Sequence, residues 1–516
     1  MNTDCSRARR QGALSFLRGL AFSVLCIALP QSTRATPSHP ERVLDAIVEL
    51  DVARARELLN EQGDSAPLPL ERARLALYTG DCEGAQAVLS GPSVNAMREG
   101  ADLLAVAAAC AGATAGALIV KDDKAGVHIR LQDGRDEALV PFIVQVAQRA
   151  MAAMQQDLGV ELPRPLRIDL VRDTFSLSAV TGLPVTAAET TGTLAVARWG
   201  RVTMISPRAT RQGYGWEDTL AHEITHLALA RATRDRAPLW LQEGIAKREE
   251  TRWREPRPGD GEPSAESIAH HAMMNGRSVG IDKLGPSIAM LPTPEAASIA
   301  YAEVQSFVNY WIAQNGDAAL KLLFADLKGL GSTNADAALR SVSGYTLSEW
   351  NIKWQHHLAQ QTPRSPLPGF PGASEGFNGQ ALARWVRLTD LLHQRGHYHA
   401  ASKAITPALE PAGKLALVRW RAARASLAEG QPDRAREQLG GVSDIDILHG
   451  AWFALRGRFL ERDGAGNEAK IAFDLGLSVD PLFDEVACHG RAHHEKFSPP
   501  SSAEDKLCGA ARQIIR

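Results

Sequence analysis

Two histidines and a glutamate in one short segment have the types and spacing of a metal site with a catalytic base. The segment reads His222-Glu223-Ile224-Thr225-His226, an H-E-x-x-H pattern. In a helix, side chains four positions apart lie one turn apart on the same face, so both imidazoles can reach one metal ion. Glu223 can reach a water on that ion and act as a general base. The pattern predicts hydrolysis assisted by a metal ion.

A third ligand is expected, because a catalytic zinc site normally has three protein ligands and one position for water. Glu243 is a carboxylate of the right type. Sixteen residues separate it from His226, enough to end one helix, turn at Arg231–Ala237 and return antiparallel. Pro238 can open the second helix, and the small Gly244 predicts that this helix lies close against the first.

These motifs resemble those of the gluzincin branch of zinc metallopeptidases, whose best-known member is thermolysin. More closely, they resemble the peptidase MA-like families. The family pattern H-E-[LI]-T-H corresponds to His222–His226, and P-x-W-L-x-E-G-x-A corresponds to Pro238–Ala246. The resemblance extends over roughly residues 125–360. It implies a zincin-like fold and hydrolysis of peptide bonds.

The resemblance also implies a role for each residue of the site. It implies that His222, His226 and Glu243 bind Zn²⁺. It implies that Glu223 activates the zinc-bound water and later protonates the leaving amine. The tetrahedral oxyanion needs a further donor, and Tyr301, at the start of a later predicted helix, is our candidate.

One position departs from the thermolysin-like pattern. Those sites have an Asp four residues after the third ligand, which orients a ligand histidine, whereas this chain has Lys247. Asp218, Glu249 or Glu250 would have to supply that carboxylate. The resemblance further implies that the substrate backbone binds along an edge strand, for which Leu194–Ala197 is the best candidate.

The elements around the motifs predict an α+β fold with a small sheet. Alternating apolar residues predict strands at Val127–Leu131, at Leu166–Leu170 and, as a pair around Trp199-Gly200, within Leu194–Ile205. We expect the sheet to be antiparallel. Asp136 is expected to cap a helix that ends at Gly159. From about residue 213 to residue 361 the pattern is mostly helical.

All-α regions of helical repeats are predicted on both sides of this central zincin-like domain, which we assign to residues 119–361. Residues 36–118 form a helical repeat-like region, and residues 362–376, with four prolines and three glycines, an interdomain linker. Residues 377–516 resemble tetratricopeptide repeats; in the last unit the matching positions are Gly457, Ala469, Phe473 and Pro481. A generic helical bundle is the alternative.

The first 35 residues have the layout of a secretory signal peptide. A basic start precedes the apolar run Leu20–Leu29, and small residues lead to cleavage after Ala35. We therefore expect export to a periplasm or out of the cell. In an oxidising compartment the four remaining cysteines predict two local disulfides, Cys82–Cys110 and Cys488–Cys508. Four buried free thiols are the alternative.

Composition and charge narrow the classes of function. The chain has 516 residues, 57 basic and 59 acidic, and a formal net charge of −2. This near-neutral balance argues against a chain built mainly for nucleic acid. No later stretch reaches about 18 apolar residues, so no transmembrane segment is expected.

Together these observations predict an exported zinc metallopeptidase. Its helical repeats would dock a protein or peptide substrate, or a protein partner. The alternative is a non-catalytic scaffold that retains a zinc site and binds a peptide or protein without cleaving it. The sequence predicts no particular oligomeric state.

Overall fold

The described residues of the computed structural model begin with the first N-terminal helix and end with the last C-terminal one. They are residues 38–61, 68–210, 213–257, 260–261, 263–329, 334–361, 379–440, 442, 449–488 and 502–513. The predicted signal peptide, residues 1–35, and the predicted linker, residues 362–376, lie outside them. Among the described residues, every helix is too short or too polar to cross a membrane.

A mixed five-stranded sheet has the order β1-β2-β3-β5-β4. Its strands are β1 (Leu118–Asp122), β2 (Val127–Leu131), β3 (Leu166–Val171), β4 (Ala195–Arg198) and β5 (Arg201–Ile205). β1 and β4 are antiparallel to their neighbours, whereas β2, β3 and β5 run parallel. The expectation of an antiparallel sheet is therefore wrong for its centre.

Helical crossovers explain the parallel centre. α7 (Val140–Leu158) connects β2 to β3, while α8 (Thr174–Thr181) and α9 (Val185–Thr191) lie between β3 and the β4–β5 hairpin. Such crossovers return the chain in the same direction. β4 pairs only with β5, so it forms an edge of the sheet.

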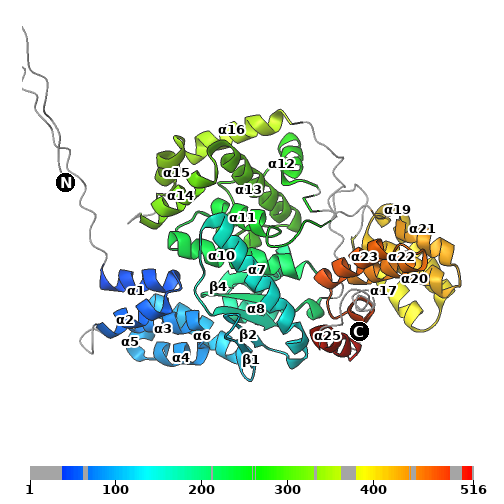
Figure 1. Cartoon of the computed structure of the whole chain (residues 1–516), viewed down its shortest axis with the longest axis horizontal. Helices are drawn as coiled ribbons and strands as arrows, with labels where there is room; N and C mark the ends of the chain where they lie inside the picture. Colours follow the sequence, from blue (N-terminus) through cyan, green and yellow to red (C-terminus); the bar gives the residue numbers. More distant parts are fainter. Residues whose placement is uncertain are drawn as a thin grey trace, which may run out of the picture. The chain divides into compact units, whose positions relative to one another are not determined.

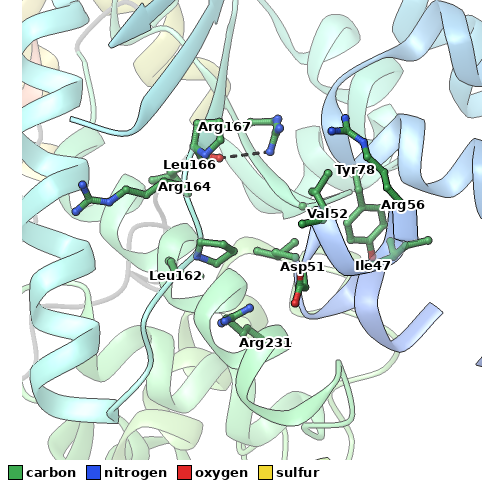
Figure 2. Close-up of a pocket in the computed structure, with 15 residues that line it drawn as sticks. Ile47, Asp51, Val52, Arg56, Tyr78, Leu162, Arg164, Leu166, Arg167 and Arg231 are labelled. Atoms are coloured by element: carbon green, nitrogen blue, oxygen red, sulfur yellow. Dashed lines mark hydrogen bonds between the residues drawn. The ribbon is translucent and has the colours of Figure 1, made fainter. Parts of the chain in front are cut away.

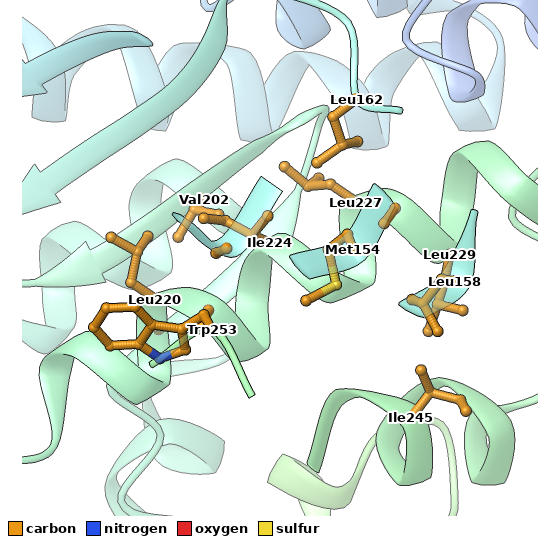
Figure 3. Packing of buried hydrophobic residues seen from close by; sticks show 14 of the residues in the cluster. Met154, Leu158, Leu162, Val202, Leu220, Ile224, Leu227, Leu229, Ile245 and Trp253 are labelled. Atoms are coloured by element: carbon orange, nitrogen blue, oxygen red, sulfur yellow. The ribbon is translucent and has the colours of Figure 1, made fainter. Parts of the chain in front are cut away.

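α10 (Trp216–Thr233) carries the H-E-x-x-H segment and is buried on most sides. It packs against α7, β4, β5, α11 (Leu239–Glu249) and α14 (Asp317–Gly329). Figure 3 shows Ile224 beside Val202 of β5, with Met154 of α7 near Leu227. This apolar packing fixes the helix and therefore the direction of its polar side chains.

The remaining helices of the central region follow in chain order (Figure 1): α12 (Ala265–Met274), α13 (Pro294–Asn315), α15 (Ala335–Ser343) and α16 (Leu347–Ala359). α13 packs closely on α11. A Cβ on Gly244 would lie 2.4 Å from Val308 Cγ2 and 2.6 Å from the Val304 carbonyl oxygen. The close approach that Gly244 permits is thus to α13, whereas the sequence suggested α10.

The entry to α7 also differs from expectation. A short 3₁₀ helix, η2 (Gly134–Leu139), precedes α7, and the Asp133 carboxylate caps it. Asp136 does not cap α7; its buried carboxylate accepts hydrogen bonds from Ser206 Oγ at 2.9 Å and from Arg208 Nε at 3.0 Å. α7 does end as predicted, at Gly159 in the left-handed region.

The N-terminal helices are α1 (His39–Val48), α2 (Val52–Glu61), α3 (Pro69–Thr79), α4 (Cys82–Leu89), α5 (Pro92–Asn95) and α6 (Arg98–Thr114). The Cys82–Cys110 disulfide joins α4 to α6. The sequence predicted this region as helical without counting its helices.

The C-terminal helices are α17 (Gly379–Gln394), α18 (Tyr398–Ile405), α19 (Leu409–Ala412), α20 (Ala416–Ala428), α21 (Pro432–Gly440), α22 (Gly450–Arg462), α23 (Gly466–Val479) and α25 (Ser502–Arg512). α17 packs with α18, α20 with α21 and α22 with α23. Within the last pair, a Cβ on Gly457 would meet the Phe473 ring at 2.8–2.9 Å. The Cys488–Cys508 disulfide links the segment after α23 to α25, so both disulfides are paired as predicted.

Candidate metal centre

The three candidate ligands come from two helices joined by a tight connection. His222 and His226 lie one turn apart on α10, and Glu243 lies on the second turn of α11. α10 ends at Arg234, which has a left-handed φ of 55°. Pro238 then caps α11, as the sequence predicted for the start of this helix.

The ligand atoms are spaced as one metal ion requires. His222 Nε2 and His226 Nε2 are 3.2 Å apart, and each lies 3.5 Å from Glu243 Oε2. Tetrahedral zinc with bonds of about 2.0–2.2 Å places its ligand atoms about 3.3–3.5 Å apart. Glu243 Oε2 is also buried and accepts no hydrogen bond from the described residues. The trio therefore fits a metal ion, which would satisfy this oxygen.

The charges around the trio favour a cation. Burial alone would raise the pKa of Glu243, but His226 and His222 hold it well below its usual range. Burial alone would lower the pKa of His222, but the neighbouring carboxylates of Glu243 and Glu250 raise it to about 10. Carboxylates thus surround two nitrogen ligands, an arrangement that attracts positive charge.

Glu250 supplies the carboxylate to His222 that an Asp at the position of Lys247 supplies in thermolysin-like sites. Its Oε2 lies 3.3 Å from His222 Nδ1, the ring nitrogen opposite the one in the trio. Its other oxygen accepts a hydrogen bond from Lys247. A carboxylate on the far nitrogen fixes the ring orientation and tautomer of a metal-binding histidine.

The other two carboxylates considered for this position point elsewhere. Asp218 pairs with Arg254 at 2.6 Å and accepts the Trp253 indole N–H at 3.0 Å. Glu249 pairs with Arg248 at 2.7 Å. Glu250 comes seven residues after Glu243, almost two turns along α11, so sequence spacing alone did not single it out.

Glu223 lies at the boundary between α10 and the edge strand. Its Oε2 accepts the backbone N–H of Ala197 on β4 at 2.5 Å. The side chain is buried, and this burial raises the pKa of Glu223. The raised pKa suits a carboxylate that takes up and returns a proton.

Tyr301 of α13 also lies at the site. Its ring is 6.1 Å from the His222 ring, in an edge-on arrangement, and Lys247 Nζ lies 5.9 Å from its centre. Burial, followed by the neighbouring carboxylates, raises the pKa of Tyr301 well above 10. The hydroxyl therefore keeps its proton and can donate it in a hydrogen bond.

The arginines between the two metal-site helices have structural partners. Arg234 pairs with Asp45 at 2.9 Å and with Glu49 at 2.5 Å, both on or next to α1. Only the folded chain reveals this contact, because about 180 residues separate the partners.

Comparison with known proteins identifies one segment of the chain. Residues 146–360 match the peptidase MA superfamily. The matched segment contains the helices that carry all three candidate ligands, Glu223 and Tyr301. It begins after β1 and β2, so it is shorter than the resemblance found in the sequence. No curated protein and no solved structure matches the chain.

The match supports a zincin-like metallopeptidase family for residues 146–360 and a peptidase-type hydrolase in general. A peptidase domain implies a protein or peptide substrate. Members of this superfamily are typically metal-dependent, in agreement with the ligand trio.

Proposed function

We propose that this protein is an exported zinc metallopeptidase. The observation that carries the proposal is the spacing of 3.2–3.5 Å among His222 Nε2, His226 Nε2 and Glu243 Oε2. The buried Glu243 Oε2 supports it, because both imidazole nitrogens lie 3.5 Å away, too far for good hydrogen bonds, and a metal ion would bind all three atoms. Two nitrogens and one carboxylate oxygen form a donor set that zinc prefers, with one position left for water or substrate.

The chain's own residues account for the proton transfers. When bound, zinc would lower the pKa of a water molecule and polarise the scissile carbonyl. Glu223 takes the proton from the attacking water and gives it to the leaving amine. The protonated Tyr301 hydroxyl donates a hydrogen bond to the oxyanion.

The edge of β4 supplies a place for the substrate backbone. Ala197 directs its N–H away from β5, toward Glu223. In an antiparallel pair, backbone groups of alternate residues face the free edge, so Ala195 faces the same way. An extended peptide can therefore add to β4 with its scissile bond next to Glu223.

Substitution of Glu223 tests this mechanism. In Glu223→Gln the proton acceptor is lost, so cleavage of a peptide library should fall about 10²–10⁴-fold while bound zinc stays at the wild-type level. Cleavage is followed by mass spectrometry and zinc by elemental analysis. Glu189→Gln, at an exposed position on α9, also removes one carboxylate charge and should change neither the cleavage rate nor the bound zinc. A variant that cleaves at the wild-type rate would overturn the mechanism.

The alternative is a scaffold that binds zinc and a peptide without cleaving it. Lys247 favoured this alternative, because the usual orienting Asp is missing. Glu250 now supplies a carboxylate to His222, which removes much of that support. A scaffold would bind peptides equally well in wild type and Glu223→Gln and would generate no new peptide ends.

We also propose that the protein is exported and that its C-terminal helices dock the substrate or a protein partner. Two disulfides agree with an oxidising compartment, which a signal peptide would reach. The paired C-terminal helices, which we interpret as tetratricopeptide-like repeats, would recruit the substrate or a protein partner. We propose an N-terminal helical region at residues 36–118, a zincin-like domain at residues 119–361, a linker at residues 362–376 and a C-terminal helical domain at residues 377–516.

A further inference from the structure

A cavity formed partly by α10 shares none of the candidate metal ligands. Its volume is about 450 Å³. The α1–α2 connection, the segment that leads into β3 and the last part of α10 form its walls (Figure 2). Neither the three candidate ligands nor Glu223 lines it.

The lining is strongly basic. Arg56 comes from α2, Arg164 from the segment before β3, Arg167 from the start of β3, and Arg231 from α10. Among the described residues of the lining, Asp51 is the one acidic side chain. Arg164 points away from the other three (Figure 2), so three guanidinium groups and one carboxylate give the cavity a formal charge of +2.

Three of these arginines have no carboxylate partner. Within the described part of the chain, no ion pair involves Arg56, Arg164 or Arg167. Arg167 donates only to the Pro165 carbonyl, at 3.3 Å, along the dashed line in Figure 2. Asp169, two residues further along β3, is already engaged by Arg130 and Arg201.

Arg56 and Arg167 therefore place like charges near each other on two walls of the cavity. Burial lowers the pKa of Arg167, and repulsion from Arg56 lowers it further. An anion bound between them would relieve this repulsion. Arginine, with its planar fork of donors, suits bidentate binding of carboxylate and phosphate.

We propose that this cavity binds a small, multiply charged oxyanion, one that carries a phosphate group or two carboxylates. The anion bridges Arg56 of α2 and Arg167 of β3, with Arg231 closing the site from α10. Tyr78 and Leu162 contribute ring and apolar surface for the uncharged part of the ligand. Binding thereby ties the N-terminal helices to the sheet and to the helix of the metal ligands.

Calorimetry and thermal unfolding of the zinc-loaded chain, with inorganic phosphate and succinate as probes, test the proposal. Potassium chloride of equal ionic strength is the reference. One probe at least should bind with a stoichiometry near one and raise Tm as its concentration rises, because it binds the folded state. The absence of saturable binding by either probe would overturn the proposal.

Three variants locate the binding. Arg167→Gln and Arg56→Gln should each weaken binding about tenfold or more, the effect of losing a charge-assisted hydrogen bond. Arg98→Gln, at an exposed position on α6 outside the cavity, should stay within about twofold of wild type. Arg56 is itself exposed, so its variant should fold normally. Equal binding by the Arg56 and Arg167 variants and wild type would place the anion elsewhere and overturn the proposal.

The two probes distinguish the sources of the anion. Tighter binding of phosphate indicates a phosphate-bearing ligand, and tighter binding of succinate indicates a dicarboxylate. Either result supports the cavity as an oxyanion site. Neither depends on the proposed peptidase activity, because the readouts are heat and Tm.

Discussion

The orientation of His222 depends on a single carboxylate. Glu250 contacts its Nδ1, while Lys247 contacts the other oxygen of Glu250. The lysine that replaces the usual Asp thus helps to hold the carboxylate that does the orienting. A neutral side chain at position 250 would accept a weaker hydrogen bond from the imidazole and would contribute no negative charge.

We therefore predict that Glu250→Gln lowers zinc affinity about 10–100-fold, the usual cost of losing an orienting partner. Competition with a chromogenic chelator measures the affinity. Glu255→Gln, at an exposed position just after α11, is the matched control and should leave affinity unchanged. Wild-type affinity in Glu250→Gln would contradict the positioning role.

The residues of the trio could be predicted from the sequence, because the relation between the two histidines is set by their spacing within one helix. The H-E-x-x-H spacing sets the relation between His222 and His226 within one helix, whatever surrounds it. The carboxylate that contacts His222 Nδ1 could not be predicted from such local spacing. Whether Asp218, Glu249 or Glu250 reaches the ring depends on the rotation of α11 against α10, which spacing does not encode.

At the scale of elements, the packing of α11 on α13 depends on the missing side chain of Gly244. A methyl group there would lie 2.6 Å from the Val304 carbonyl oxygen, a backbone atom that cannot rotate away. Glu243 is the preceding residue, so any shift of α11 moves a candidate ligand.

Gly244→Ala should therefore destabilise the fold by about 1–3 kcal/mol, as overpacking of a core does. Urea unfolding gives the free energy of unfolding. Gly112→Ala, in α6 with no neighbour within 4 Å of the new Cβ, serves as the control. It should be neutral or stabilising by up to about 1 kcal/mol, because Ala favours helix over Gly. Similar effects of the two variants would contradict the packing argument.

A buried histidine makes the C-terminal helices sensitive to acid. His449 Nδ1 accepts the backbone N–H of Trp452 at 3.2 Å and so caps α22. Burial, assisted by the Arg421 charge, lowers the pKa of His449 to about 3, although Asp390 opposes the shift. Because the folded pKa is below the unfolded value, the folded state binds fewer protons, and stability falls as the pH drops below about 6.5.

We predict that wild type loses about 2 kcal/mol more stability than His449→Asn between pH 7.5 and pH 5. Asn keeps an oxygen that can cap the helix but does not titrate in this range. Urea unfolding at both pH values gives the free energy of unfolding of each protein. The other histidines are present in both proteins, so their contributions cancel in the difference. An equal loss in both proteins would show that His449 is protonated in the folded state.

The direction of the central strands could not be predicted from their own residues. Alternating apolar residues located β2, β3 and the β4–β5 pair, because alternation reflects burial of one face. Direction depends on the connections, and the crossover through α7 made β2 and β3 parallel. β1 was missed because its side chains are mostly exposed and carry little apolar pattern.

At the scale of the whole molecule, the N-terminal helices are attached to the connection between the metal-site helices. Asp45 and Glu49 pair with Arg234, and Glu49 also pairs with Lys328 in the last turn of α14. The N-terminal region therefore supports the loop that sets the spacing of α10 and α11. The sequence alone predicts only a repeat-like helical region here, because these pairs join residues far apart in the chain.

The most direct test of the central claim is the zinc content per chain of the purified protein, compared with that of Glu243→Ala. We predict about one zinc per wild-type chain, lost or greatly weakened in the variant, because Glu243 Oε2 completes the three-ligand set. Absence of zinc from wild type even after reloading, or equal retention in the variant, would contradict the metal centre proposed for His222, His226 and Glu243.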